Sequence, residues 1–159
     1  MRRCMFLALV LFPVVALLLR GCTCQGSNLR IVNPHGLHVD RVAIWREMQQ
    51  ARMAARRFGA RHGLQFQRQG LPSTVAVFRS PADMADYMGW PSRSYGLRVV
   101  ARVDLDVGVV YLGRPGNMED LRVELGKWFF YPASYRWGVD RDRDIELREL
   151  VERFAKEER

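Results

Sequence analysis

The residues with the clearest chemical potential lie in one pentapeptide, VELGK at 123–127, inside an apolar stretch at 118–131 whose periodicity predicts a helix. Glu124 places a carboxylate inside this apolar stretch, where an ionised group needs a partner. Lys127 follows three residues later, within reach of an ion pair with Glu124 on one helix face. The pentapeptide therefore predicts a half-buried ion pair on the helix.

The three histidines do not extend this cluster. His35 and His38 lie in a segment rich in glycine, asparagine and proline, and His62 comes near the end of a predicted helix. None of them is spaced to share a helix face with Glu124. We therefore expect surface or capping histidines rather than metal ligands.

The N-terminus predicts export. Two arginines precede an unbroken apolar run at 4–19, which together have the form of a secretory n-region and h-region. The run is short for a membrane-spanning helix, so cleavage is favoured over a signal-anchor, which stays as the alternative. Gly21 before Cys22 resembles a bacterial lipoprotein cleavage site, although Arg20 departs from that pattern. We expect lipid attachment at Cys22 and a location in the bacterial cell envelope, anchored to the membrane on its periplasmic or extracytoplasmic side.

The expected organisation is a signal peptide or signal-anchor at 1–21, a flexible tether at 22–38 and one folded domain at 39–159. The formal net charge is +8, and three signal arginines account for part of it, which leaves +5 for the exported part. A basic domain favours anionic lipid headgroups or acidic polymers. No segment has the interleaved basic and aromatic residues of a nucleic-acid binder, so nucleic acid is not an expected partner.

The pattern of the folded part predicts an α+β domain. It has an N-terminal amphipathic helix, a small and mainly antiparallel sheet of about three strands, a short helix after the first strand, and two C-terminal helices. The expected elements are helices beginning near 40, 81, 118 and 140 and strands at 74–79, 97–103 and 107–112. The three residues 104–106 are short enough to join the last two strands as a hairpin.

This order of elements resembles the catalytic core of gluzincin metallopeptidases of the peptidase MA type. The likeness runs through most of 40–154, including the strand at 109–112 and the helix that carries Glu124. In that family the last strand borders the substrate cleft, and the following helix carries the motif H-E-x-x-H. The resemblance implies a zincin-like core.

The same resemblance implies a site that has lost its metal. Glu124 falls at the position of the general base, Val123 and Lys127 fall at the first two zinc-ligand positions, and Asp140 falls near the third. Valine has no donor atom and a protonated lysine repels a cation, so these residues cannot hold catalytic zinc. We expect no cofactor, and we expect Lys127 to supply the positive charge that the carboxylates of Glu124 and Asp140 require.

The resulting prediction is an exported, membrane-tethered, non-catalytic peptidase-like domain. Its expected work is to bind a peptide or protein partner in the remnant cleft, with the strand at 107–112 offering an edge for an added strand. Two alternatives stay open. One is an active hydrolase that uses Glu124 in an atypical site, and the other is a purely structural envelope lipoprotein with a closed pocket.

Overall fold

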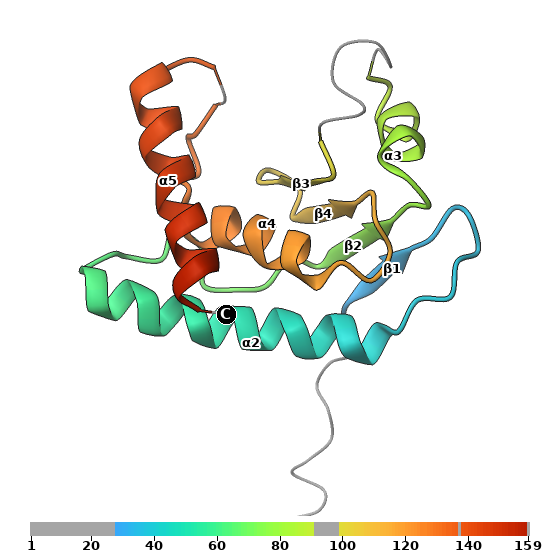
Figure 1. The fold of residues 1–159 in the computed structure, drawn as a ribbon, viewed down its shortest axis with the longest axis horizontal. Coiled ribbons are helices and arrows are strands. Elements are labelled where there is room, and N and C mark those ends of the chain that lie inside the picture. Colours follow the sequence, from blue (N-terminus) through green and yellow to red (C-terminus); the bar gives the residue numbers. More distant parts are fainter. Residues whose placement is uncertain (1–27, 91–98, 137, 159) are drawn as a thin grey trace, which may run out of the picture.

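The computed structural model describes residues 28–90, 99–136 and 138–158, and the fold in these ranges is α+β (Figure 1). The expected signal, Cys22 and positions 97–98 of one predicted strand lie outside the described residues. Four strands and four helices follow one another within these ranges. They are β1 (Arg30–Val32), α2 (Arg41–His62), β2 (Thr74–Val77), α3 (Pro81–Tyr87), β3 (Ala101–Asp104), β4 (Val109–Leu112), α4 (Met118–Phe130) and α5 (Arg141–Glu157).

The strands form one mixed sheet in the order β1-β2-β4-β3. β1 pairs with β2 and β2 with β4 in parallel, and only the β3–β4 hairpin is antiparallel. The prediction of about three mainly antiparallel strands is therefore wrong in strand number and direction. The physical reason is that α2 and α3 lie between successive strands and provide the long crossovers that parallel pairing needs.

The predicted tether at 22–38 is also too long. Leu29 is 3% exposed and belongs to the core, and β1 pairs in register with β2 from Arg30 onward. The sequence pattern hides this strand because it has three residues, only two of them apolar. The fold therefore begins at or before Leu29.

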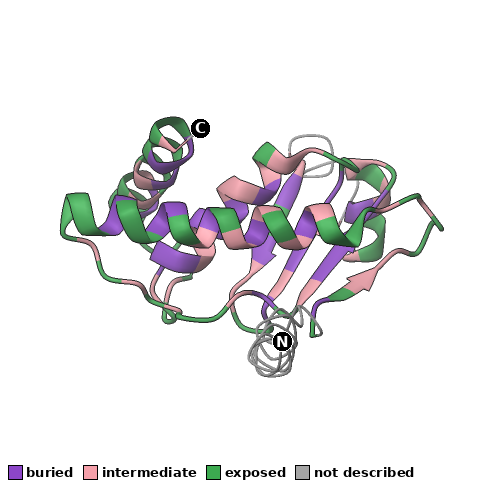
Figure 2. Cartoon of the chain, turned by 90° about the horizontal axis from the view of Figure 1, so that it is seen from below, coloured by how far each residue is buried: buried purple, intermediate pink, exposed green. Residues whose placement is uncertain are grey.

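Each face of the sheet carries its own core. Val75 and Val110 point to the larger core, which α2, α4 and α5 complete, whereas Ala76 on the other face packs with Phe78 and Met84. This alternation follows the two-residue period of a strand, and both faces are covered because the centre of the sheet is parallel. Figure 2 shows α2 crossing one face of the sheet, with buried positions toward the strands and exposed positions outward.

Side-chain caps define the helix starts near the cavity described below. Asn117 accepts hydrogen bonds from the backbone N–H groups of Glu119 and Asp120 at the start of α4, and Asp140 caps α5 through the N–H of Arg143. These caps satisfy backbone donors that have no partner within the helix. Among the described helices, none has the length and apolar character needed to cross a bilayer.

Candidate functional site

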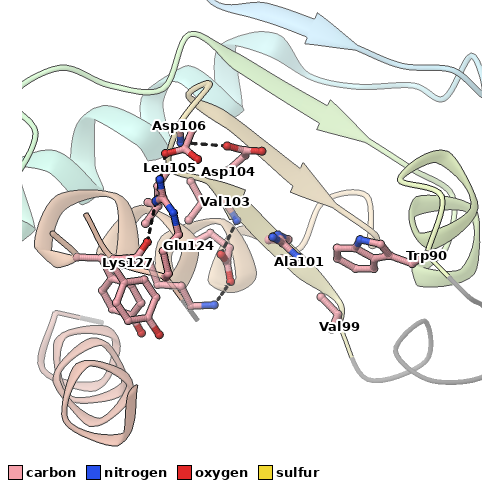
Figure 3. Close-up of a pocket in the computed structure, with 13 residues that line it drawn as sticks. Trp90, Val99, Ala101, Val103, Asp104, Leu105, Asp106, Glu124 and Lys127 are labelled. Carbon is pink, nitrogen blue, oxygen red and sulfur yellow. Dashed lines mark hydrogen bonds and ion pairs between the residues drawn. The ribbon is translucent and has the colours of Figure 1, made fainter. Parts of the chain in front are cut away.

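A cavity of about 630 Å³ lies between the edge strand β3 and the helix α4 (Figure 3). β3 forms one wall, α4 forms the floor, and the segment after α4 closes one end. The side chains that line it are Trp90, Val99, Ala101, Arg102, Val103, Asp104, Leu105, Asp106, Glu124, Lys127, Tyr131, Tyr135 and Arg136. The lining thus combines aromatic rings with both signs of charge, a composition common in ligand sites.

Glu124 lies at the floor of the cavity and is 3% exposed. Its Oε2 atom accepts a hydrogen bond from the backbone N–H of Val103 at 2.7 Å, and its Oε1 atom accepts one from the Lys127 ammonium. Both oxygens therefore have a donor, and the buried charge has an opposite charge beside it. These two contacts compensate the desolvation of the buried carboxylate, as a buried ion pair requires.

The ion pair predicted between Glu124 and Lys127 is confirmed. The two residues are three positions apart on α4, which brings them to one side of the helix. The side chain of Lys127 is 31% exposed and lines the cavity, so its remaining N–H donors face the open space or its rim. Val123 is half-buried on α4 but is absent from the cavity lining, so the pentapeptide contributes Glu124 and Lys127 only.

Asp140 does not join these two residues. It is exposed and serves as the N-cap of α5, where Oδ1 accepts the N–H of Arg143 at 3.1 Å. The expectation that Lys127 compensates Asp140 therefore has no counterpart in the described contacts. The carboxylate that is buried on α5 is Asp144, which accepts hydrogen bonds from the Tyr135 hydroxyl at 2.6 Å and from the Gly138 N–H at 2.9 Å.

Strand β3 has a free edge, and this edge borders the cavity. The N–H of Val103 points away from β4 toward Glu124, so the backbone groups of Ala101, two residues earlier, point the same way. Among the described residues, only Glu124 occupies this edge. The sequence-based assignment of the free edge to residues 107–112 is wrong, because β4 lies between β2 and β3 and is paired on both sides.

Two tyrosines after α4 form the end wall. Burial, together with the charge of Glu124, raises the pKa of Tyr131, so its hydroxyl keeps its proton throughout the physiological range. Burial and the hydrogen bond to Asp144 likewise raise the pKa of Tyr135. The two rings stack edge to face, with centroids 4.7 Å apart. The Tyr131 hydroxyl is buried and has no hydrogen-bond partner within the described residues.

The rim of the cavity carries fixed charges. The guanidinium of Arg102 lies over the Trp90 ring, 5.0 Å from its centroid, and Arg136 approaches Asp106 at 3.5 Å. Both are exposed contacts, so each contributes little to stability on its own. Arg102, Arg136 and Asp106 therefore place both positive and negative charge at the rim of a cavity that is lined by aromatic rings.

The residues that the resemblance to zinc peptidases equates with metal ligands do not fit a zinc ion. Zinc requires nitrogen, sulfur or carboxylate donors in a near-tetrahedral set. Val123 supplies no donor, the Lys127 ammonium is itself a cation, and both oxygens of Glu124 already accept hydrogen bonds. Within residues 28–90, 99–136 and 138–158, no group of three histidine, cysteine or acidic side chains converges to bind a metal.

Sequence reasoning found the floor of this cavity but missed its walls. The sequence gives no signal that separates three of the aromatic residues of the lining, Trp90, Tyr131 and Tyr135, from aromatic residues of the core. It likewise does not separate Asp144 from the other acidic residue in the first turn of α5. The one sequence feature that could have indicated the wall is the run of aromatic residues directly after the Glu124 helix.

No family model, curated protein or solved structure matches the chain.

Proposed function

We propose that the protein is an exported, membrane-tethered and non-catalytic peptidase-like domain that binds an extended peptide segment in the cavity between β3 and α4. The observation that carries this proposal is the free edge of β3 along a cavity of about 630 Å³. An extended peptide can add to such an edge through main-chain hydrogen bonds, while the cavity takes alternate side chains. The cavity volume is in the range of ordinary ligand sites.

The absence of catalysis is proposed from the state of Glu124. Its two oxygens are engaged by the Val103 N–H and by Lys127, so taking up a proton from water would neutralise the carboxylate and remove the buried ion pair. The zincin-like origin of the fold is part of the same proposal. It is supported by the order of elements, in which a β-hairpin precedes the helix of Glu124.

The binding proposal is tested by selection from a library of random peptides displayed in extended form, with the full-length protein in detergent micelles as the target. Ala101→Pro removes an N–H that points away from β4, so the sheet keeps its ladder while strand addition is blocked. We expect this variant to bind selected peptides about two- to tenfold more weakly, since the one lost main-chain hydrogen bond costs roughly 0.5 to 1.5 kcal/mol.

A second pair of variants separates binding from folding. Trp90→Ala removes a cavity wall and leaves the backbone of β3 unchanged, and Val139→Ala removes an apolar side chain that is 80% exposed and lies outside the cavity. Trp90→Ala is expected to weaken peptide binding and Val139→Ala to leave it unchanged. Selected peptides that bind all three variants as tightly as wild type would show that the site lies elsewhere.

The tether is tested separately, through Cys22. Metabolic labelling with a fatty acid is expected to mark the wild-type protein and to be lost in Cys22→Ala. If the wild-type chain keeps Met1 and carries no lipid, the protein is anchored by an uncleaved signal-anchor and not by a lipid. Either result leaves the cavity proposal intact.

A further inference from the structure

Helix α2 presents an outward face on which every acidic or strongly basic residue is an arginine. The outward positions include Val42, Arg46, Met53 and Arg57, which are spaced by four, seven and four residues and so fall on one side of the helix. Arg56 and Arg61 flank this line. The only acidic residue of α2, Glu47, turns inward, where its side chain is 12% exposed and pairs with Arg122.

The same face exposes large apolar side chains. Val42 is 64% exposed and Met53 is 53% exposed, and both lie close to the centre of the basic face. Arg57 and Arg61 pair with acidic residues at the end of α5, whereas Arg46 and Arg56 have no recorded ion pair in the described part of the chain. A helix that combines arginines with exposed apolar side chains and lacks outward carboxylates suits the surface of an anionic membrane.

The described part of the chain begins at Asn28, close to the start of α2, so a tether to the membrane would hold this face near the bilayer. The proposed lipid is attached to Cys22, and six residues later the chain reaches Asn28, a distance of at most roughly 20 Å in a fully extended chain. Leu29 is held at the start of α2 by the Arg41 guanidinium, which donates to its carbonyl at 2.6 Å. Since α2 is about 33 Å long, a tether of this length brings much of the helix within reach of the bilayer.

We propose that the outward face of α2 lies on an anionic lipid surface when the protein is tethered. This inference rests on the membrane tether of the proposed function, but not on the peptide site. In Figure 1, α2 runs along one side of α4, and β3 lies on the other side. A domain seated on α2 therefore directs the cavity between β3 and α4 away from the bilayer, toward partners in the aqueous compartment.

The test uses hydroxyl-radical footprinting of the full-length protein in two kinds of vesicle, zwitterionic phosphatidylcholine alone and phosphatidylcholine with phosphatidylglycerol. Met53 reports on the α2 face, because its sulfur is oxidised where water reaches it. Tyr87 on α3 is 57% exposed and serves as the reference in the same molecule. We expect oxidation of Met53 to fall at least about threefold in the anionic vesicles relative to Tyr87, as two unpaired arginines each favour the anionic surface roughly fivefold.

A matched pair of charge reversals completes the test. Arg46→Glu with Arg56→Glu is expected to abolish the protection of Met53. Arg141→Glu with Arg143→Glu makes the same change of net charge at exposed positions of α5 and is expected to preserve it. Equal Met53 oxidation in both lipids, or protection that survives the α2 reversal, would overturn the proposal.

Two further outcomes have distinct meanings. Protection of Met53 that grows with protein density and ignores lipid charge would overturn the proposal in favour of contact between copies of this chain. Flotation with phosphatidylcholine vesicles reports the tether by itself. A chain that fails to float with them refutes the tether. Protection of Met53 on anionic vesicles supports binding of the α2 face to anionic lipid in either case, and its absence refutes it.

Discussion

The carboxylate of Glu124 on α4 accepts the backbone N–H of Val103 on β3 at 2.7 Å. A side chain thereby occupies the place that a main-chain carbonyl of an added strand would take at this edge. The contact connects the helix to the strand that borders the cavity. It also leaves the backbone groups of Ala101 as the nearest free position for a ligand strand, so we expect a bound peptide to pair there first.

The ion pair on α4 yields a stability prediction. Lys127→Met leaves the buried Glu124 carboxylate without its opposite charge, so we expect a loss of about 1 to 3 kcal/mol in the free energy of unfolding. In a Glu124→Gln background the same change is expected to cost less, since no buried charge is stranded. Urea unfolding of the four proteins measures both values, and strictly additive effects would refute the coupling.

The donor set of the cavity yields a metal prediction. We expect the purified protein to bind zinc only substoichiometrically and to have no peptidase activity, because two of the three residues that the resemblance equates with zinc ligands, Val123 and Lys127, cannot donate to a cation. Any trace activity should therefore be the same in Glu124→Gln as in wild type. Elemental analysis after expression in zinc-supplemented medium measures the first value. A value of about one zinc per chain would contradict the non-catalytic proposal and favour the alternative of an atypical hydrolase.

Tyr131 yields a pH prediction. Burial raises its folded-state pKa above the unfolded value of about 10, so its stabilising contribution is complete below that pH and is lost as the pH rises further. Tyr131→Phe removes a buried hydroxyl that has no hydrogen-bond partner within the described residues. We expect this variant to be at least as stable as wild type at pH 7 and to lose less stability between pH 9 and pH 11, as thermal unfolding would show.

Tyr135→Phe is the matched comparison on the same wall. Its hydroxyl donates to buried Asp144 at 2.6 Å, so removing it leaves that carboxylate oxygen without a donor. We expect a loss of roughly 1 to 3 kcal/mol at pH 7. Equal stability of the two phenylalanine variants at pH 7 would contradict the different roles assigned to the two hydroxyls.

Gly126 yields a packing prediction. A Cβ atom at this position of α4 would meet ring carbon Cδ1 of Phe154 at 2.8 Å and Cγ1 of Val151 at 3.1 Å. Alanine improves helix propensity by about 1 kcal/mol, but forcing α4 and α5 apart costs roughly 1 to 3 kcal/mol. We expect Gly126→Ala to destabilise the protein on balance. Gly70→Ala, where nothing lies within 4 Å of the added atom, serves as the control in the same unfolding assay.

Local sequence patterns determined most of the helical framework. Helices were expected to begin near 40, 81 and 118, and the structure has them there, with Asp40, Ser80 and Asn117 accepting backbone N–H groups as N-caps. The β-branched run at 74–77 formed a strand as predicted. The pairing of Glu124 with Lys127 was predictable for the same reason, since two residues three apart on a helix meet whatever the rest of the fold does.

Tertiary structure alone decided the sheet and the cavity. The sequence does not say which strand lies at an edge, because pairing partners are distant along the chain, and β3 rather than β4 has the free edge. Asp140 and Asp144 stand four residues apart with similar neighbours, yet only Asp144 is buried, and its carboxylate accepts hydrogen bonds from Tyr135 and Gly138 in the segment between α4 and α5. The hydrogen bond from Val103 to Glu124 depends on the packing of α4 against β3, which no local pattern encodes.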